Sequence, residues 1–248
     1  MKNCLPILLL MLAFSTSAFA ASYINGLDAN NPPFAYVDEK SGKPVGFDVE
    51  ALDWIAKTMG FEVKHVPIAW DTIIPILLAQ KIDMICSGMT ITPARERLVA
   101  FSVPYWRVYN VFVVKKDSDL TVGAILTEKL KIGGQRGSSE ATALVKMQKQ
   151  QGVRFSVRLY DSGFQMIDDV VNGRIHAVIM DSQPAQDAVS HGKPVRIAGI
   201  LGAPVNFGVA FRVEDAELRQ LVNAGYAKLM ADPFWMQLQL KYGVKSFD

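Results

Sequence analysis

The sequence predicts an α/β protein built from two lobes, and three observations support this. Short strand-like runs alternate with longer helix-like runs, a pattern typical of parallel α/β units. The alternation occurs twice, and a polar stretch suited to a linker, Lys115–Asp119, separates the two series. After the second series, one strand and two helices remain without strand partners of their own. We therefore expect the chain to return to the first lobe, so that two crossings join the lobes and a cleft lies between them.

The first series contains clear helix signals. One helix opens at Asp48 and ends at Gly60, because glycine readily adopts the left-handed conformation found at helix C-termini. The apolar residues that recur at helical spacing within it are Val49, Leu52, Ile55 and Ala56. Thr92 and Pro93 mark another helix start, since threonine caps helices and proline loses nothing at the first helical position. The other elements expected here are strands at residues 23–28, 61–66, 83–87 and 108–114 and a helix from residue 71.

The second series repeats the alternation. Its expected strands lie at residues 131–134, 156–159, 177–181 and 195–201, and its expected helices at residues 138–150, 162–172 and 182–190. A last strand at 207–211 and two helices over 214–242 complete the chain. These elements predict a first lobe made of residues 21–108 and 205–248, and a second lobe made of residues 109–204.

Residues 1–20 have the three parts of a secretory signal peptide. Lys2 supplies a positive charge, residues 5–14 form an apolar run too short to span a bilayer, and Ala18-Phe19-Ala20 is a small-x-small cleavage site. We expect cleavage after Ala20 and export of the mature chain, in which no later segment is a candidate membrane span. Cys86 is then the one cysteine left, and its strand-like surroundings predict a buried, unreactive thiol.

Composition and motifs exclude several classes of function. The chain has 26 lysines and arginines against 24 aspartates and glutamates, so nothing favours a nucleic-acid partner. Its histidines, His65, His176 and His191, have neither metal-ligand nor catalytic spacing. No phosphate-binding loop, dinucleotide-binding motif or nucleophile elbow is present. We therefore expect no metal site and no cofactor.

Two helix starts have the chemistry needed to hold a carboxylate. Gly137 allows close approach of the backbone, while Ser138 and Ser139 add hydroxyl groups to the free N–H groups of a helix N-terminus. The turn over residues 90–95 follows a strand and carries Arg95, whose planar fork fits a carboxylate with two hydrogen bonds. With one such turn in each predicted lobe, we expect the two to face each other across the cleft.

Five longer motifs indicate the family that this sequence resembles. They are Gly46-Phe47-Asp48-Val49-Glu50, the run over residues 82–92 with Arg95-Glu96-Arg97, Phe101-Ser102-Val103-Pro104-Tyr105, Gly137-Ser138-Ser139 and the run over residues 173–178. With these motifs the chain closely resembles the bacterial extracellular solute-binding proteins of family 3, the polar amino-acid receptors of ABC importers. The resemblance covers the whole mature chain and implies the two-lobe periplasmic-binding-protein fold.

The resemblance also implies a site for a free amino acid. By position, the family's carboxylate clamp falls on Arg95, the region of Gly88 and Thr90, and Ser139, and its ammonium acceptor falls on Asp181. An α-amino acid is a zwitterion, so a cationic fork at one end and a carboxylate at the other suit it. Trp70 matches an aromatic residue that covers the ligand side chain in relatives. The full set of expected ligand-binding residues is Asp28, Asn31, Trp70, Ser87, Gly88, Thr90, Arg95, Gln135, Ser138, Ser139 and Asp181.

Departures from the family pattern bear on the ligand side chain. Asn31 stands where relatives often have an aromatic residue, Gln135 stands where glutamine receptors have a lysine, and His176 replaces a frequent aspartate. Asp28 stands where receptors for basic amino acids and for glutamine place an aspartate. We favour a basic ligand (arginine, lysine, ornithine or histidine), because Asp28 can pair with a cation and Gln135 adds no repelling charge. Glutamine stays open, since Asn31 and Gln135 could satisfy an amide.

The function that this resemblance implies is transport without catalysis. We expect a monomeric receptor in the periplasm that captures a free L-amino acid and delivers it to an ABC permease in the inner membrane. The alternative is a cyclohexadienyl or arogenate dehydratase-like enzyme, which has the same fold and needs a general acid in the cleft. Such relatives carry a glutamate on the strand that returns to the first lobe, whereas residues 205–211 contain no carboxylate.

Overall fold

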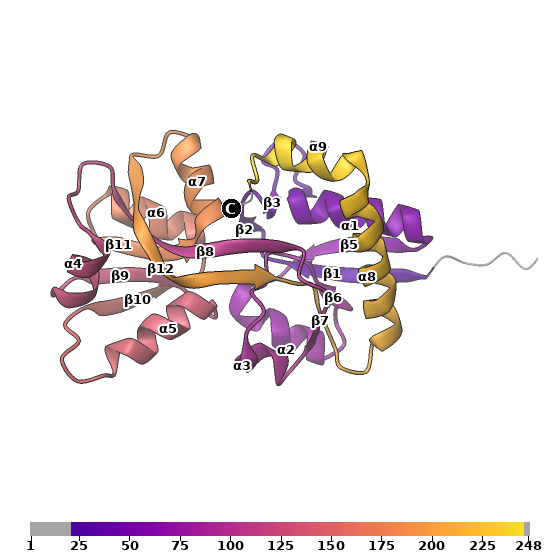
Figure 1. Cartoon of the computed structure of the whole chain (residues 1–248), viewed down its shortest axis with the longest axis horizontal. Helices are drawn as coiled ribbons and strands as arrows, with labels where there is room; N and C mark the ends of the chain where they lie inside the picture. Colours follow the sequence, from indigo (N-terminus) through magenta and orange to yellow (C-terminus); the bar gives the residue numbers. More distant parts are fainter. Residues whose placement is uncertain (1–20, 246–248) are drawn as a thin grey trace, which may run out of the picture.

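The computed structural model describes residues 21–245 and folds them into two lobes that lie side by side (Figure 1). Each lobe has its own five-stranded sheet, and buried apolar clusters lie on both faces of each sheet. The predicted α/β class and two-lobe arrangement are confirmed. The signal peptide expected over residues 1–20 lies outside the described residues. Among residues 21–245, none of the helices is both long enough and apolar enough to cross a bilayer.

The sheet of the first lobe has the strand order β5-β1-β6-β13-β7. These strands are β1 (Ser22–Leu27), β5 (Glu62–Pro67), β6 (Met84–Ile85), β7 (Ala100–Phe101) and β13 (Ala210–Phe211). The helices are α1 (Phe47–Met59), the 3-10 turn η1 (Trp70–Thr72), α2 (Ile73–Leu78), α3 (Pro93–Glu96), α8 (Ala216–Ala231) and α9 (Pro233–Tyr242). A small antiparallel sheet lies alongside, made of β2 (Asn30–Asn31), β3 (Ala35–Val37) and β4 (Pro44–Val45). Met84 packs in the same apolar cluster as α1 and α8, and its neighbour Ile85 in the cluster of α2, because successive strand residues point to opposite faces.

Helix α1 follows the prediction closely because glycines set both of its ends. Gly60 has φ 79°, and its N–H donates to the carbonyl of Ala56, which ends the helix. Gly46 at the other end has φ 136°, and a Cβ there would lie 2.2 Å from the carbonyl oxygen of Phe34. No other residue type fits that position. The turn at Gly46 therefore fixes where Asp48 enters the lobe.

The sheet of the second lobe has the strand order β10-β9-β11-β8-β12. These strands are β8 (Trp106–Lys115), β9 (Lys131–Gln135), β10 (Ser156–Tyr160), β11 (Ala177–Asp181) and β12 (Val195–Phe207). The helices are α4 (Val122–Thr127), α5 (Ser139–Gln148), α6 (Gly163–Val171) and α7 (Ser182–Ser190). Along β8, Val111 and Val113 pack in the apolar cluster of α6, while Phe112 and Val114 pack in that of α4 and α5.

Strands β8 and β12 connect the lobes as an antiparallel pair. Their ladder runs from Lys115 and Val195 in the second lobe to Trp106 and Phe207, which belong to the apolar core of the first lobe. Its register shifts between Leu201 and Val205. The lobe boundaries given above, after residues 108 and 204, stay a prediction, because both strands continue from one lobe into the other.

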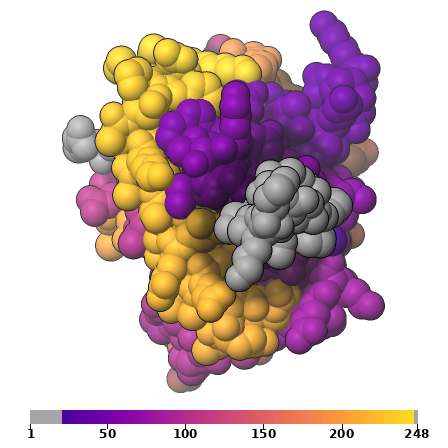
Figure 2. All heavy atoms as spheres, turned by 90° about the vertical axis from the view of Figure 1, so that its right-hand side faces the viewer, coloured from indigo at the N-terminus to yellow at the C-terminus, as the bar shows by residue number. Residues whose placement is uncertain are grey.

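The last two helices return to the first lobe, as expected. Both α8 and α9 pack against α1. Figure 2 shows them, in orange and yellow, beside the purple N-terminal part of the chain on one face of the molecule. One further link to the second lobe comes from the end of this segment, where the side chain of Gln183 donates to the carbonyl of Lys245 at 2.5 Å.

Each sheet contains the parallel pairs that the α/β pattern predicts, β5-β1-β6 and β10-β9-β11. The sheets are mixed, because β8, β12 and β13 run against their neighbours as the chain crosses and returns. One expectation about the link between the lobes is wrong. The polar stretch Lys115–Asp119 is not the link between the lobes. It lies inside the second lobe, where Lys115 still pairs with Val195 and the Ser118 carbonyl accepts hydrogen bonds from Arg196.

Candidate functional site

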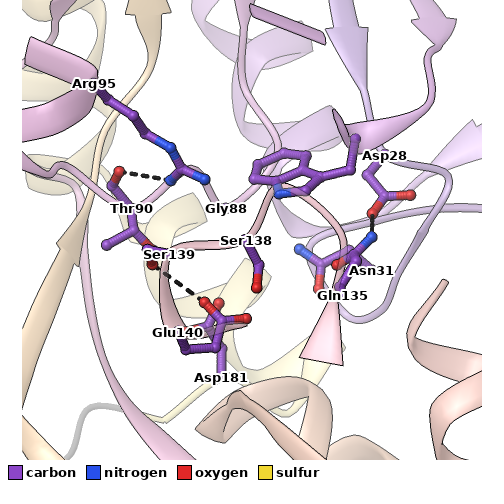
Figure 3. Close-up of a pocket in the computed structure, with 11 residues that line it drawn as sticks. Asp28, Asn31, Gly88, Thr90, Arg95, Gln135, Ser138, Ser139, Glu140 and Asp181 are labelled. Carbon is purple, nitrogen blue, oxygen red and sulfur yellow. Dashed lines mark hydrogen bonds between the residues drawn. The ribbon is translucent and has the colours of Figure 1, made fainter. Parts of the chain in front are cut away.

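A cavity lies between the lobes and is lined by most of the predicted site residues (Figure 3). All of the expected ligand-binding residues line it except Ser87, and one residue that was not expected, Glu140, lines it as well. In Figure 3, Arg95, Thr90 and Ser139 lie on one side, Asp181 and Glu140 lie together, and Asp28, Asn31 and Gln135 lie on the other side. The full lining is Asp28, Asn31, Trp70, Gly88, Thr90, Arg95, Gln135, Ser138, Ser139, Glu140 and Asp181.

Ser87 and Gly88 form the turn that follows β6. Ser87 is fully buried and its hydroxyl accepts a hydrogen bond from the Asp28 N–H at 2.9 Å, so Ser87 supports the cavity wall from behind. The N–H of Gly88 donates to Oδ2 of Asp48 at 2.6 Å, and Gly88 has φ 62°. That N–H is therefore already hydrogen-bonded inside the protein. It does not contribute to the carboxylate clamp that was expected at Gly88.

Asp48 holds this turn from within the first lobe. It is fully buried, and its Oδ2 also accepts a hydrogen bond from the Tyr105 hydroxyl at 2.7 Å. Burial raises the pKa of Asp48 to about 7, against the lowering effect of its bonds from Tyr105 and Gly88. The signature stretch at residues 46–50 thus reaches the cavity indirectly, through the backbone of Gly88.

Arg95 is held in the cavity wall by backbone carbonyls of both lobes. Thr92 caps α3, as predicted, and its hydroxyl accepts from the Arg95 N–H at 3.2 Å. The guanidinium donates to the carbonyl of Thr90 at 2.8 Å and, across the cleft, to the carbonyl of Gly137 at 3.1 Å. It also lies 5.4 Å from the ring centre of Trp70. Because a guanidinium has five N–H groups, others remain for a ligand carboxylate.

Asp181 and Glu140 form a pair of carboxylates near Arg95. Asp181 ends β11, and its Oδ1 is buried without a hydrogen-bond partner among the described residues. Burial and the like charge of Glu140 raise the pKa of Asp181 well above its usual range, and the guanidinium of Arg95 opposes them. Burial also lowers the pKa of Arg95, against the attraction of these two carboxylates. A ligand ammonium group would give Asp181 its missing partner.

Glu140 was missed although it follows directly after Ser139. An acidic residue in the first turn of a helix is commonly explained by its favourable interaction with the helix dipole. The sequence alone therefore gives no reason to place Glu140 in a cavity. Glu140 is only 6% exposed, and its Oε2 accepts from the Ser139 hydroxyl at 3.2 Å. The Ser138 hydroxyl caps α5 by accepting from the Ala141 N–H at 3.2 Å. Both serines are therefore hydrogen-bonded within the protein.

Asp28 forms the opposite end of the cavity. Its Oδ2 accepts from the side-chain amide of Gln135 at 2.6 Å, a bond that spans the cleft, and its Oδ1 accepts from the Asn30 N–H at 3.0 Å. Burial raises its pKa, against the lowering effect of these hydrogen bonds. His176, by contrast, accepts from the Lys131 N–H at the edge of the second sheet and does not line the cavity.

The arrangement can hold a zwitterion with a polar side chain. A cationic fork lies near two hydroxyl groups, a carboxylate without a partner lies beside it, and a further carboxylate lies across the cavity. Each end of an amino acid would meet an opposite charge away from water, where such pairing is needed most. Within residues 21–245, no group of three or more histidine, cysteine or carboxylate side chains is placed to hold a metal ion.

The chain is similar to several known amino-acid-binding proteins. It is 29% identical to the histidine-binding periplasmic protein of Escherichia coli over 98% of this chain and 97% of that protein. It is also similar to a solved ancestral arginine-binding protein bound to arginine, with a TM-score of 0.83, 32% identity and coverage of 90% and 98%. An ancestral amino-acid-binding protein described as a precursor of cyclohexadienyl dehydratase matches with a TM-score of 0.81, 30% identity and coverage of 90% and 95%.

The family match extends over both lobes. The model of the bacterial extracellular solute-binding proteins, family 3, matches residues 23–245, which includes every strand and helix described above except the first residue of β1. The chain therefore belongs to the bacterial extracellular solute-binding proteins, family 3.

Proposed function

We propose that this protein is the periplasmic substrate-binding protein of an ABC transporter and that it captures an L-amino acid with a basic side chain. The observation that supports this most is the position of Asp28 and Asp181 at separate places in one cavity that also contains Arg95. An α-carboxylate at Arg95, an α-ammonium at Asp181 and a side-chain cation at Asp28 pair every charge of such a ligand.

The charge of the cavity favours a cation over a neutral side chain. Asp28, Glu140 and Asp181 supply three carboxyl groups, and Arg95 is the one cationic residue in the lining. Buried carboxylates without cations are costly, so a ligand that brings an additional positive charge relieves more of that cost than a neutral one. Binding of histidine and of arginine by the similar proteins agrees with this choice.

Glutamine is the second candidate, and one contact supports it. The amide of Gln135 already donates to Asp28 at 2.6 Å, so a ligand amide could make the same hydrogen bond. A dehydratase-like enzyme is a weaker alternative, because the named relatives above are binding proteins, including the dehydratase precursor.

A ligand screen followed by one substitution tests the proposal. Thermal unfolding is measured with each of the twenty amino acids and ornithine, because a ligand at a hundred times its Kd adds about 2.7 kcal/mol of stability. We expect a basic amino acid to give the largest shift. Asp28→Asn should then weaken binding of that ligand by roughly a hundredfold, because a buried ion pair is lost, and should leave the affinity for glutamine within about threefold. Asp119→Asn, on the exposed surface, is the matched control.

The outcomes separate the candidates. A large shift with glutamine and none with the basic set would favour the second candidate, and no shift with any amino acid would favour the enzyme. The proposed delivery to a permease is tested separately in cells. Uptake of the ligand should disappear when the neighbouring transporter genes are deleted, and uptake that persists would contradict this partnership.

A further inference from the structure

A second space adjoins the first cavity and shares part of its wall. The two cavities have Asn31, Gln135, Glu140 and Asp181 in common. The second continues between β2 of the first lobe and helices α6 and α7 of the second lobe. Its other lining residues are Asn30, Gly163, Met166, Met180 and Pro184. A single amino acid held as proposed above, between Arg95, Asp181 and Asp28, leaves this second space unused.

The chemistry of the second cavity differs from that of the first. Met166 is 1% exposed and Met180 7%, so these two side chains with Pro184 give it a buried apolar wall. No residue in its described lining is cationic, whereas Glu140 and Asp181 lie where the cavities meet. The side of this space formed by Met166, Met180 and Pro184 suits hydrocarbon, whereas a carboxylate would lie near two acidic groups without a cation.

Two residues at the side-chain end of the first cavity, Asn31 and Gln135, also line the second. The Asp28 carboxylate is enclosed by Asn30 and Gln135, and both of these residues line the second cavity. A cation that pairs with Oδ2 of Asp28 would use the second lone pair of this oxygen and lie beside the Gln135 amide, which donates to the first. A substituent on the ligand's cationic nitrogen would then extend past Gln135 toward Met166 and Met180.

We infer that the protein accepts basic amino acids whose side-chain nitrogen carries an extra alkyl group, and that the second cavity holds this group. The inference rests on the proposed function, since it needs the α-carboxylate at Arg95 and the side-chain nitrogen at Asp28. Methionine suits such a role because its flexible side chain adapts to alkyl groups of different shapes. Acidic substituents are excluded by the same walls.

Calorimetry with three ligands tests this in the wild-type protein. The ligands are L-lysine, Nε-propyl-L-lysine and Nε-carboxymethyl-L-lysine, of which the last two have substituents of similar length and opposite character. The Kd of Nε-propyl-lysine should lie within about tenfold of the Kd of lysine. The Kd of Nε-carboxymethyl-lysine should be at least about thirtyfold higher than that of lysine. Rejection of both substituted lysines to the same degree would overturn the inference.

Gly163 offers a way to block the second cavity without touching the first. A Cβ at Gly163 would lie 3.6 Å from the Asn30 carbonyl oxygen and 3.8 Å from Cε of Met180, which are ordinary contacts. Gly163→Ala should therefore leave all affinities unchanged. Gly163→Leu places a larger side chain in the cavity and should weaken Nε-propyl-lysine by at least about tenfold while lysine stays within about threefold.

The two proposals fail in different ways. If lysine binds and Nε-propyl-lysine does not, or if Gly163→Leu weakens both ligands equally, only the inference about the second cavity is wrong. If no basic amino acid binds to the wild-type protein, the proposed function is wrong, and the inference that rests on it is wrong with it.

Discussion

Replacement of Arg95 tests the proposed ligand orientation most directly. The side chain is only 8% exposed, and its guanidinium is hydrogen-bonded to carbonyls of both lobes. Arg95→Ala would leave the ligand carboxylate in the closed cleft without a cation. It would also remove the charge that opposes the raised pKa of Asp181, so this carboxyl group would be protonated more readily and would pair less well with a ligand ammonium group. Both effects act against binding.

The expected size follows from the burial of this charge. Removing one partner of a buried ion pair costs about 3 to 5 kcal/mol, because the other charge is left uncompensated. At about 1.4 kcal/mol for each factor of ten, Kd should rise by roughly a hundredfold to a few thousandfold. Arg95→Lys keeps the charge but loses the planar fork and the bond to the second lobe, so its loss should be smaller.

Isothermal titration calorimetry with the ligand found by the thermal screen measures these changes. The matched control is Arg136→Ala, because Arg136 lies beside the cleft and pairs with Asp71 at 3.8 Å and Asp161 at 3.2 Å but does not line the cavity. The control should bind within about threefold of the wild type. Binding of Arg95→Ala within the same range would refute the proposed orientation.

Three further predictions concern the first lobe. Burial raises the pKa of Asp48 from 3.8 to about 7, so the folded state binds the proton more tightly and the free energy of unfolding should fall as pH rises between these values. Asp48→Asn should flatten that decline in urea unfolding at pH 5 and pH 8, and an unchanged decline would contradict it. Gly46→Ala should lower the free energy of unfolding by about 3 kcal/mol or more, because a Cβ would meet the Phe34 carbonyl. Gly60→Ala should lower it by about 1 kcal/mol, because a Cβ there has nothing within 4 Å. Equal shifts in Tm would argue against this difference. Cys86 is fully buried and its thiol pKa is raised well above the usual range, so a disulfide reagent should modify it only on unfolding.

Elements with a strong local signal could be predicted from the sequence, and short ones could not. Helix α7 was expected at residues 182–190 and is found there, directly after the buried strand β11 and with Pro184 in its first turn, where a missing N–H costs nothing. The strands β2, β3 and β4 have two or three residues each, too few to show an alternating pattern. Helix α4 was missed although Thr121 caps it, because its six residues have no clear helical spacing.

The candidate site could be predicted largely from positions in family motifs, and the exceptions have physical reasons. Ser87 lies in the same turn as Gly88, but its hydroxyl accepts a hydrogen bond from the backbone N–H of Asp28 and does not line the cavity. The position of Glu140 in the cavity wall depends on how α5 approaches Arg95 across the cleft. That approach is set by contacts between lobes, such as the bond from Arg95 to Gly137, and no local sequence pattern reports it.

The paired strands β8 and β12 also determine how stiff the connection between the lobes is. A hydrogen-bonded ribbon resists stretching but bends where its ladder shifts register. This ladder shifts twice, between Ile197 and Gly199 and between Leu201 and Val205, and the second shift covers the exposed residues Gly202, Ala203 and Pro204. Apparent affinity depends on the fraction of molecules that are closed, so the compliance of this stretch contributes to Kd without any contact to the ligand. Substitutions at these residues should therefore change the apparent Kd while the contacts to the ligand stay the same.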